Sequence, residues 1–123
     1  KLKTNQEFKT HTIQVMTLFP NTVLVAHHEH VEVWHILPCN KENESKVSFS
    51  LFSIEKATTK SAKQHWENNF NLAIDVVQAE DFPLGEDVQK GFYADQKREL
   101  IFGKNEPGLQ HFHKSINQAL KDG

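Results

Sequence analysis

The sequence contains little of what usually marks a disulfide-bonded, membrane-embedded or nucleic-acid-binding protein. Its single cysteine, Cys39, excludes an internal disulfide, and it has neither a secretory apolar region nor an apolar run near the roughly 18 residues of a membrane span. The 14 basic and 16 acidic residues give a net charge of -2, which provides no basic field for nucleic acid or anionic lipid. We therefore expect a cytoplasmic protein with no nucleic-acid partner and no membrane partner.

The length of 123 residues corresponds to one domain. The hydrophobic fraction of 37% is low for a compact enzyme. Residues 1–10 are polar and unpatterned, so we interpret them as a lead-in to a domain at residues 11–123. Because the sequence starts at Lys1 rather than at a methionine, we expect it to be a piece of a longer protein.

Three runs rich in β-branched and aromatic residues follow the lead-in, at residues 12–19, 22–28 and 31–38. Their connectors are short enough for antiparallel hairpins. After a polar loop at residues 39–45, apolar Val47, Phe49 and Leu51 alternate with serines, which is the period of a half-buried strand. The pattern predicts an antiparallel meander of four strands.

The period of the apolar residues then changes from two to about 3.6, which indicates a helix. Thr58 and Thr59 can cap its start, and Pro83 with Gly85 predicts a kink or restart at 81–85. The stripe of the helix that faces the core continues in steps of three and four through Trp66, Phe70, Ala73, Val77, Asp81, Leu84 and Val88. A helix from about residue 61 to 88 on an antiparallel sheet gives an α+β fold. A short strand at 100–102 and a last helix at 109–120 complete the prediction.

Asp81 is unusual because it continues an apolar stripe that supplies no lysine or arginine to balance it. An unpaired buried carboxylate is costly, and such a group is usually neutralised, paired or bound to a metal. The residues leave three interpretations open. Asp81 is exposed at the kink and caps the second helical segment, or it is a metal ligand facing a pocket, or it is a general acid or base in an apolar site.

Four separated motifs occur along the chain: FPNT at 19–22, HVEVWHILP at 30–38, ED at 80–81 with VQKG at 88–91, and FGKNEPGLQHFH at 102–113. In order and spacing they resemble the C-terminal part of the catalytic domain in the large (alpha) subunit of Rieske non-haem iron oxygenases, the aromatic-ring-hydroxylating dioxygenase family. The resemblance covers about residues 19–120. It implies a helix-grip fold, in which an antiparallel sheet and a long kinked helix enclose an elongated apolar cavity.

In that family the iron-binding carboxylate lies eight residues before the glutamine of a Gln-x-Gly element, and these positions are Asp81 and Gln89 here. The resemblance therefore implies that Asp81 is a ligand of a mononuclear Fe(II). Gln89 is expected to orient the site from outside the ligand set, and Glu80, one step off the stripe, either faces solvent or does the same. The family's two histidine ligands and its [2Fe-2S] Rieske cluster come from segments that precede the resemblance, and one cysteine cannot build the cluster. We expect these 123 residues to bind no cofactor alone and to be inactive in isolation.

The side chains expected to line the substrate pocket are aromatic and aliphatic, although such residues more often form ordinary core. They are Trp34, Phe49, Trp66, Phe70 and Val77.

The histidines offer weaker candidates for a second site. His27, His28 and His30 fall at a predicted hairpin tip, which is more typical of a solvated turn than of a metal site. His111 and His113 lie two apart on the last helix and cannot share a helix face, so we interpret them as structural.

The resemblance implies O₂-dependent hydroxylation of an organic substrate, aromatic or carrying a quaternary amine, by dioxygenation, monooxygenation or demethylation. It also implies a reductase or ferredoxin as electron donor and a parent that is a homotrimer or an α3β3 assembly. The alternative, from a different class, is a standalone helix-grip module that binds an apolar small molecule without catalysis. Rieske-type cysteine and histidine pairs encoded upstream of Lys1 would favour the oxygenase.

Overall fold

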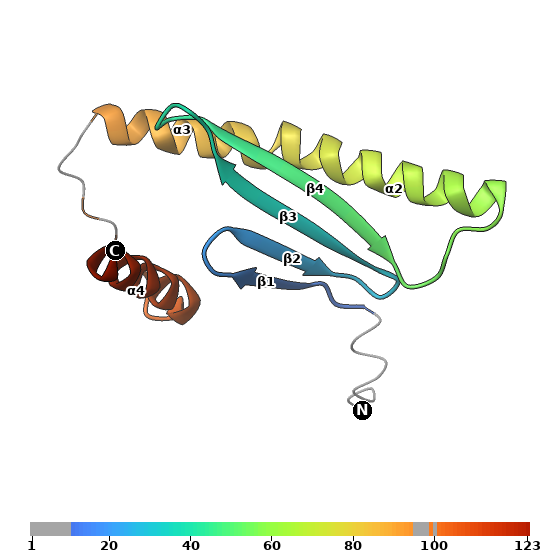
Figure 1. The fold of residues 1–123 in the computed structure, drawn as a ribbon, viewed down its shortest axis with the longest axis horizontal. Coiled ribbons are helices and arrows are strands. Elements are labelled where there is room, and N and C mark those ends of the chain that lie inside the picture. Colours follow the sequence, from blue (N-terminus) through green and yellow to red (C-terminus); the bar gives the residue numbers. More distant parts are fainter. Residues whose placement is uncertain (1–10, 95–98, 100) are drawn as a thin grey trace.

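The computed structural model describes residues 11–94, 99 and 101–123, so the predicted lead-in at 1–10 lies outside the described residues. The described part forms four strands and three helices. The strands are β1 (Gln14–Leu18), β2 (Thr22–Ala26), β3 (His30–Pro38) and β4 (Ser45–Ser53), and the helices are α2 (Lys60–Ala79), α3 (Asp81–Ala94) and α4 (Pro107–Asp122). The α2–α3 run extends along the sheet, and α4 lies near the turn between β1 and β2 (Figure 1). The α+β class is confirmed.

The strands form one antiparallel sheet in the order β1-β2-β3-β4, which confirms the predicted meander. Directly paired residues share a face of the sheet, and successive residues of a strand alternate between faces. Trp34 of β3 pairs with both Val23 of β2 and Phe49 of β4. In the same way Glu32 pairs with Val25 and with Leu51, so these two rows lie on one face.

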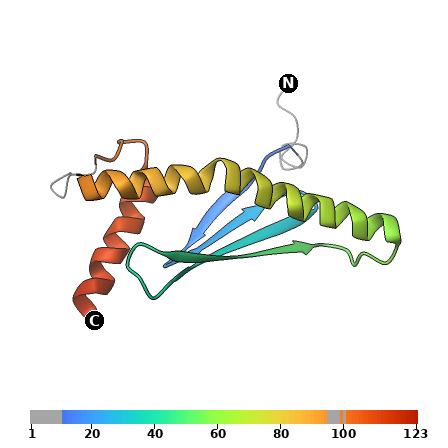
Figure 2. The same ribbon diagram turned by 90° about the horizontal axis from the view of Figure 1, so that it is seen from above.

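The long helix begins and bends where the sequence predicts. The Thr59 hydroxyl accepts a hydrogen bond from the Ala62 N–H at 3.1 Å, which satisfies one of the free donors of the first turn. Helix α2 ends at Ala79 and α3 begins at Asp81, with Pro83 in the first turn of α3, where a missing N–H costs little. The two helices run nearly end to end over the sheet, and the run continues to Ala94, beyond the predicted end (Figure 2).

Aromatic side chains hold α2 against the face that carries Trp34. The Trp34 ring stacks on Phe49 with centroids 4.1 Å apart, and Phe49 contacts Phe70 of α2 at 4.7 Å. Further along the same face, His30 meets Trp66 edge to face at 5.5 Å. Trp34 is the most buried of the described hydrophobic residues, with 9% of its surface exposed, so the core is centred on this aromatic group.

The segment before α4 differs from the prediction. Leu100 lies outside the described residues, and Ile101 and Phe102 are not in a strand. Phe102 instead packs on His113 of α4 at 4.7 Å, and the Gly103 N–H donates to the Glu106 carboxylate at 2.6 Å in a turn that leads into α4. The predicted strand at 100–102 is therefore wrong at these two positions, because a strand needs a neighbour to pair with and this segment turns into a helix.

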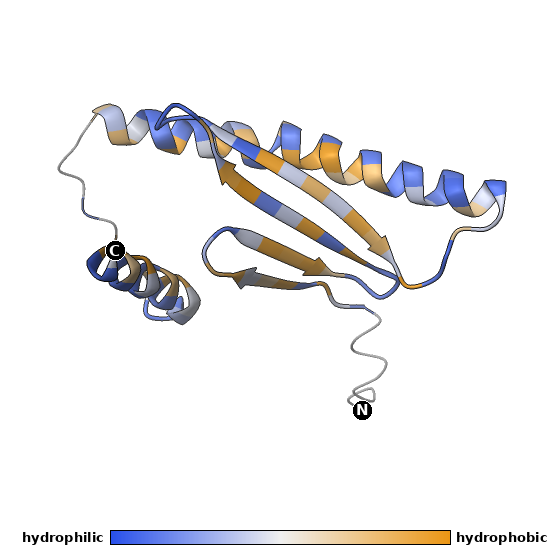
Figure 3. Cartoon of the chain, viewed as in Figure 1, coloured by the Kyte–Doolittle hydropathy of each residue, from blue (hydrophilic) through white to orange (hydrophobic). Residues whose placement is uncertain are grey.

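The chain leaves an unusually large surface in solvent. Its accessible area is 10769 Å², whereas a compact monomer of 14.2 kDa would expose about 6,800 Å². On the sheet face opposite α2, Met16, Leu18 and Phe52 are 43%, 51% and 60% exposed. Figure 3 shows apolar residues along the strands as well as on α2. The described residues thus leave many large apolar side chains in contact with solvent.

Candidate functional site

The β2–β3 hairpin brings two histidines and a glutamate together. Ala26 pairs with Val31, and the His27 N–H donates to the His30 carbonyl at 2.9 Å, so the two histidines lie opposite each other at the closed end of the hairpin. Glu32 follows His30 by two positions on β3 and therefore lies on the same face. That face is the one against which α2 packs.

The three side chains are close enough to share one ligand. The imidazoles of His27 and His30 stack with centroids 4.2 Å apart and an angle of 9° between the rings. Glu32 Oε1 lies 3.1 Å from His27 Nε2 and 3.6 Å from His30 Nε2. Each of the three residues offers a ligand atom within 4.8 Å of the other two, and no other such group of three occurs among the described residues.

Trp34 fixes the glutamate of this cluster. Its indole Nε1–H donates to Glu32 Oε2 at 3.0 Å. One carboxylate oxygen is therefore occupied by the indole, and the other, Oε1, faces the two histidines. Trp34 is itself nearly buried, so its packing restricts the orientation of the carboxylate.

The cluster is largely shielded from water. The side chains of His27, His30 and Glu32 are 26%, 12% and 12% exposed. Burial and the neighbouring His27 lower the pKa of His30, against the opposing attraction of Glu32 and Glu29. The His27 Nε2 atom is buried, and despite its 3.1 Å approach to Glu32 it is not aligned for a hydrogen bond with any described group. The arrangement therefore contains a buried nitrogen whose bonding capacity is unused.

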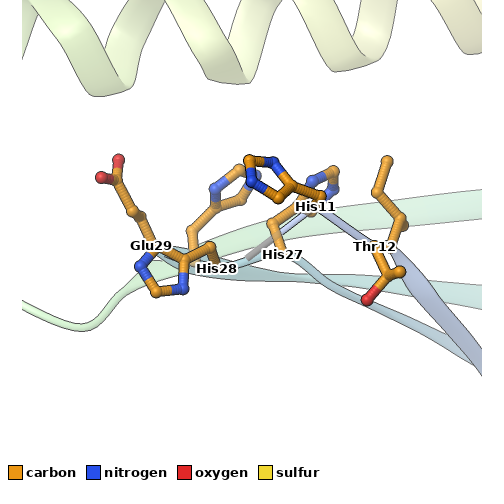
Figure 4. A pocket seen from close by; sticks show the side chains of 7 residues that line it. His11, Thr12, His27, His28 and Glu29 are labelled. Carbon is orange, nitrogen blue, oxygen red and sulfur yellow. The ribbon is translucent and has the colours of Figure 1, made fainter. Parts of the chain in front are cut away.

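Two pockets adjoin the cluster. One of about 300 Å³ lies between the sheet and α2 and is lined by Val25, His27, His30, Glu32, Asn69, Leu72, Ala73, Val76 and Val77. A second, open pocket of about 370 Å³ lies at the hairpin end and includes His11, Thr12, His28 and Glu29 (Figure 4). The cluster is thus reached from two sides, and one side is walled by α2.

Of the residues expected near the iron, Glu80 and Asp81 lie at the break between α2 and α3, and Gln89 lies within α3. Glu80 closes α2 through its N–H, which donates to the Val76 carbonyl at 3.0 Å, and its own carbonyl accepts from the Leu84 N–H at 3.3 Å. Asp81 is the first residue of α3, where a negative charge is favoured by the helix dipole. Asp81, Glu80 and Gln89 are all exposed. Because Asp81 is exposed within these residues, burial does not require a cation to balance its charge.

The comparisons with known proteins decide the family. A family profile described as "Ring hydroxylating alpha subunit (catalytic domain)" matches residues 2–122. The chain belongs to this ring-hydroxylating family. Neither a curated protein nor a solved structure matches it. The resemblance inferred from the four motifs is confirmed.

Ring-hydroxylating alpha subunits normally use non-haem iron. Such iron is held by two histidines and a carboxylate. Asp81 offers a carboxylate, but it belongs to no group of three metal-binding side chains in residues 11–94, 99 and 101–123. Among the described residues, only His27, His30 and Glu32 supply two histidines and a carboxylate together, and Asp81 as an iron ligand stays a prediction.

The expected pocket residues of the ring-hydroxylating domain lie between the sheet and α2. Trp34, Phe49 and Phe70 form one aromatic group, in which the Phe49 ring contacts both Trp34 and Phe70. Trp66 lies beside His30, and Val77 lines the pocket of about 300 Å³. Whether these side chains contact a substrate stays a prediction.

The hairpin histidines require a correction. His28 is exposed, as expected of a solvated turn, but His27 and His30 are not, because α2 covers the face on which they lie. Glu32 was not singled out from the sequence. The signal is the spacing His-x-x-His-x-Glu, which places all three side chains on one face only if the hairpin closes at Ala26 and Val31.

The remaining candidates are peripheral. His111 is exposed and lines a groove with Phe19 and Phe112, whereas His113 is half-buried against Phe102. Cys39 is a free, exposed thiol after β3. None of the helices in the described part of the chain combines the length and the apolar character that a membrane crossing requires.

Proposed function

We propose that the chain is the C-terminal part of the catalytic domain of a Rieske-type ring-hydroxylating oxygenase alpha subunit. In this proposal it provides Asp81 as the carboxylate ligand of the mononuclear Fe(II) and part of a pocket in which an organic substrate is hydroxylated with O₂. The observation that carries the proposal is the family match over residues 2–122. The agreement in the positions of Asp81 and Gln89 supports the choice of ligand.

In this proposal the sheet, α2 and the start of α3 have different roles. The sheet and α2 form a wall, and the stack of Trp34, Phe49 and Phe70 fixes α2 on that wall. The break at Glu80 starts a new helix at Asp81, so the direction of this carboxylate is set independently of the α2 stripe. When bound, iron in this family supplies the activation of O₂, and the chain supplies a ligand and an apolar surround.

The exposed surface supports a role within a larger assembly. The accessible area exceeds that of a compact monomer by more than half, and the sheet face opposite α2 is apolar. Apolar surface of this extent usually marks an interaction site. The same observation disfavours the alternative of a standalone module that binds an apolar molecule, because such a module would need to cover its own sheet.

The partners follow from the proposal. The substrate is an organic molecule, aromatic or carrying a quaternary amine, and electrons come from a reductase or ferredoxin through a [2Fe-2S] Rieske cluster. The two histidine ligands and the cluster are supplied outside these 123 residues. The assembly is a homotrimer or an α3β3 complex in the cytoplasm.

The test compares Asp81→Ala with Glu86→Ala in the protein that carries this chain. Both residues are exposed acids of α3, so the pair controls for loss of surface charge. Asp81→Ala is expected to remove the mononuclear iron and turnover and to leave the Rieske absorption unchanged, while Glu86→Ala keeps all three. Normal iron content and activity in Asp81→Ala would reject the ligand assignment.

A further inference from the structure

We propose that His27, His30 and Glu32 form a second metal site, separate from Asp81, that binds a first-row divalent transition metal such as zinc. The site lies at the closed end of the β2–β3 hairpin, on the sheet face that α2 covers. It goes beyond the proposed oxygenase function, which assigns no role to these three residues.

The spacing of the ligand atoms agrees with a common metal ion. Two ligands bound to tetrahedral zinc at about 2.0–2.1 Å lie about 3.3 Å from each other. The observed distances from Glu32 Oε1 are 3.1 Å to His27 Nε2 and 3.6 Å to His30 Nε2. The two distances match this spacing, and because the imidazoles are stacked at an angle of 9°, one ring must rotate for both nitrogen lone pairs to face the same ion. Two histidines with one carboxylate are a ligand set that zinc and Fe(II) both accept.

The buried nitrogen of His27 is the second observation. A buried polar atom without a hydrogen-bond partner costs on the order of 1–3 kcal/mol. Nε2 of His27 is such an atom, and it lies 3.1 Å from Glu32 Oε1 without the alignment of a hydrogen bond. A metal ion would use this nitrogen and offset the cost, because coordination needs the lone pair and not a proton.

Trp34 prepares the glutamate for this role. Its N–H holds Glu32 Oε2 at 3.0 Å and leaves Oε1 for the ion. Outer hydrogen bonds of this kind orient metal ligands and affect affinity by about 10- to 100-fold. Trp34 is therefore a positioning residue of the proposed site and not a ligand.

His27, His30 and Glu32 are the three protein ligands of the proposed site. The adjoining pocket of about 300 Å³ has room for a further ligand of the ion. It is lined on the α2 side by the amide of Asn69 and by apolar residues such as Val77. An ion held by three protein ligands keeps at least one coordination position, which here opens toward this pocket. Water or a substrate group can occupy that position.

The experiment is a titration of the chelator-stripped protein with zinc, monitored by competition with a chromophoric chelator, and with cobalt, monitored by visible absorption. Variants His27→Ala and Glu32→Gln each remove one ligand. Their matched controls are His28→Ala and Glu29→Gln, which alter exposed neighbours of the same type. We expect both ligand variants to weaken binding at least tenfold and both controls to stay within about twofold of the parent. Trp34→Phe is expected to weaken binding and shift the cobalt spectrum.

Far-UV circular dichroism without metal shows which variants keep the fold. If His27→Ala does not fold, the nearly isosteric Glu32→Gln decides. Equal affinity in Glu32→Gln and Glu29→Gln, or the absence of stoichiometric zinc binding in the parent, would overturn the proposal and leave a metal-free polar cluster. Asp81→Asn is expected to retain this zinc affinity. The two proposals therefore fail separately: the iron assignment fails if the Asp81 variant keeps its iron, and the second site fails if the Glu32 variant keeps its zinc affinity.

Discussion

Replacing Trp34 by phenylalanine tests whether the indole hydrogen bond to Glu32 organises the core. Phenylalanine keeps an aromatic ring against Phe49 but removes the donor that lies 3.0 Å from Glu32 Oε2. A hydrogen bond to a charged group contributes about 1.5–3 kcal/mol. Because the glutamate side chain is 12% exposed, water reaches it in part. We therefore expect a loss near the lower end, about 1–2 kcal/mol.

The assay is urea denaturation followed by far-UV circular dichroism, since tryptophan fluorescence would change with the substitution itself. The single variants Trp34→Phe and Glu32→Ala are compared with the double variant in a thermodynamic cycle. The hydrogen bond predicts a coupling free energy of about 1 kcal/mol or more between the two positions. A coupling within about 0.3 kcal/mol of zero would refute the reasoning and leave only the packing of the ring.

Three further predictions concern the cap, the pH dependence and the exposed sheet. Thr59→Ala is expected to lower the free energy of unfolding by about 1 kcal/mol because it removes the cap on Ala62, while Thr58→Ala changes it by less than about 0.5 kcal/mol in the same urea assay. With a chelator present, stability is expected to fall as the pH drops below 6.5, because burial and His27 lower the pKa of folded His30 and the unfolded chain then binds more protons. Urea titrations between about pH 5 and 8 should show that the free energy of unfolding depends less on pH in His30→Gln than in the parent. The chain alone is expected to self-associate through its apolar sheet face, and Met16→Lys should reduce the mass measured by light scattering after size exclusion.

Each of these expectations can fail in a definite way. Equal destabilisation by the two threonine variants would show that the hydrogen bond from Ala62 N–H to the Thr59 hydroxyl is not the cause. A pH slope that His30→Gln leaves unchanged would assign the proton uptake to other groups. A monomeric mass for the parent chain at every concentration would show that its sheet face does not drive association.

The strands and the long helix were predictable because their signals are local. Alternation around Val47 and Phe49 and the 3.6-residue stripe through Phe70 and Val77 each depend on neighbouring positions only. The cap at Thr59 is likewise encoded within one helical turn. These elements therefore agree with the structure without knowledge of any tertiary contact.

The His27, His30 and Glu32 cluster could not be predicted with the same ease, because it depends on two tertiary facts. One is the register in which Ala26 pairs with Val31, and the other is the cover that α2 gives to that face. Sequence reasoning had only the hairpin tip, where histidines are usually solvated. The short strand expected at 100–102 is absent at residues 101 and 102 for a similar reason, since a strand is defined by its neighbour.

The position of Asp81 shows the limit of periodicity. The stripe of α2 predicts that residue 81 faces the core, but the helix ends at Ala79 and a new one starts. A break resets the relation between spacing and face, so the side chain is exposed. The assignment of Asp81 as an iron ligand therefore depends on the family and not on burial.

Anomalous X-ray scattering at the iron edge, from crystals of the iron-loaded protein that carries this chain, tests the central claim most directly. The account predicts a mononuclear iron peak within coordinating distance of the Asp81 carboxylate, at the start of α3. An iron peak bounded only by His27, His30 and Glu32, with Asp81 in solvent, would contradict it.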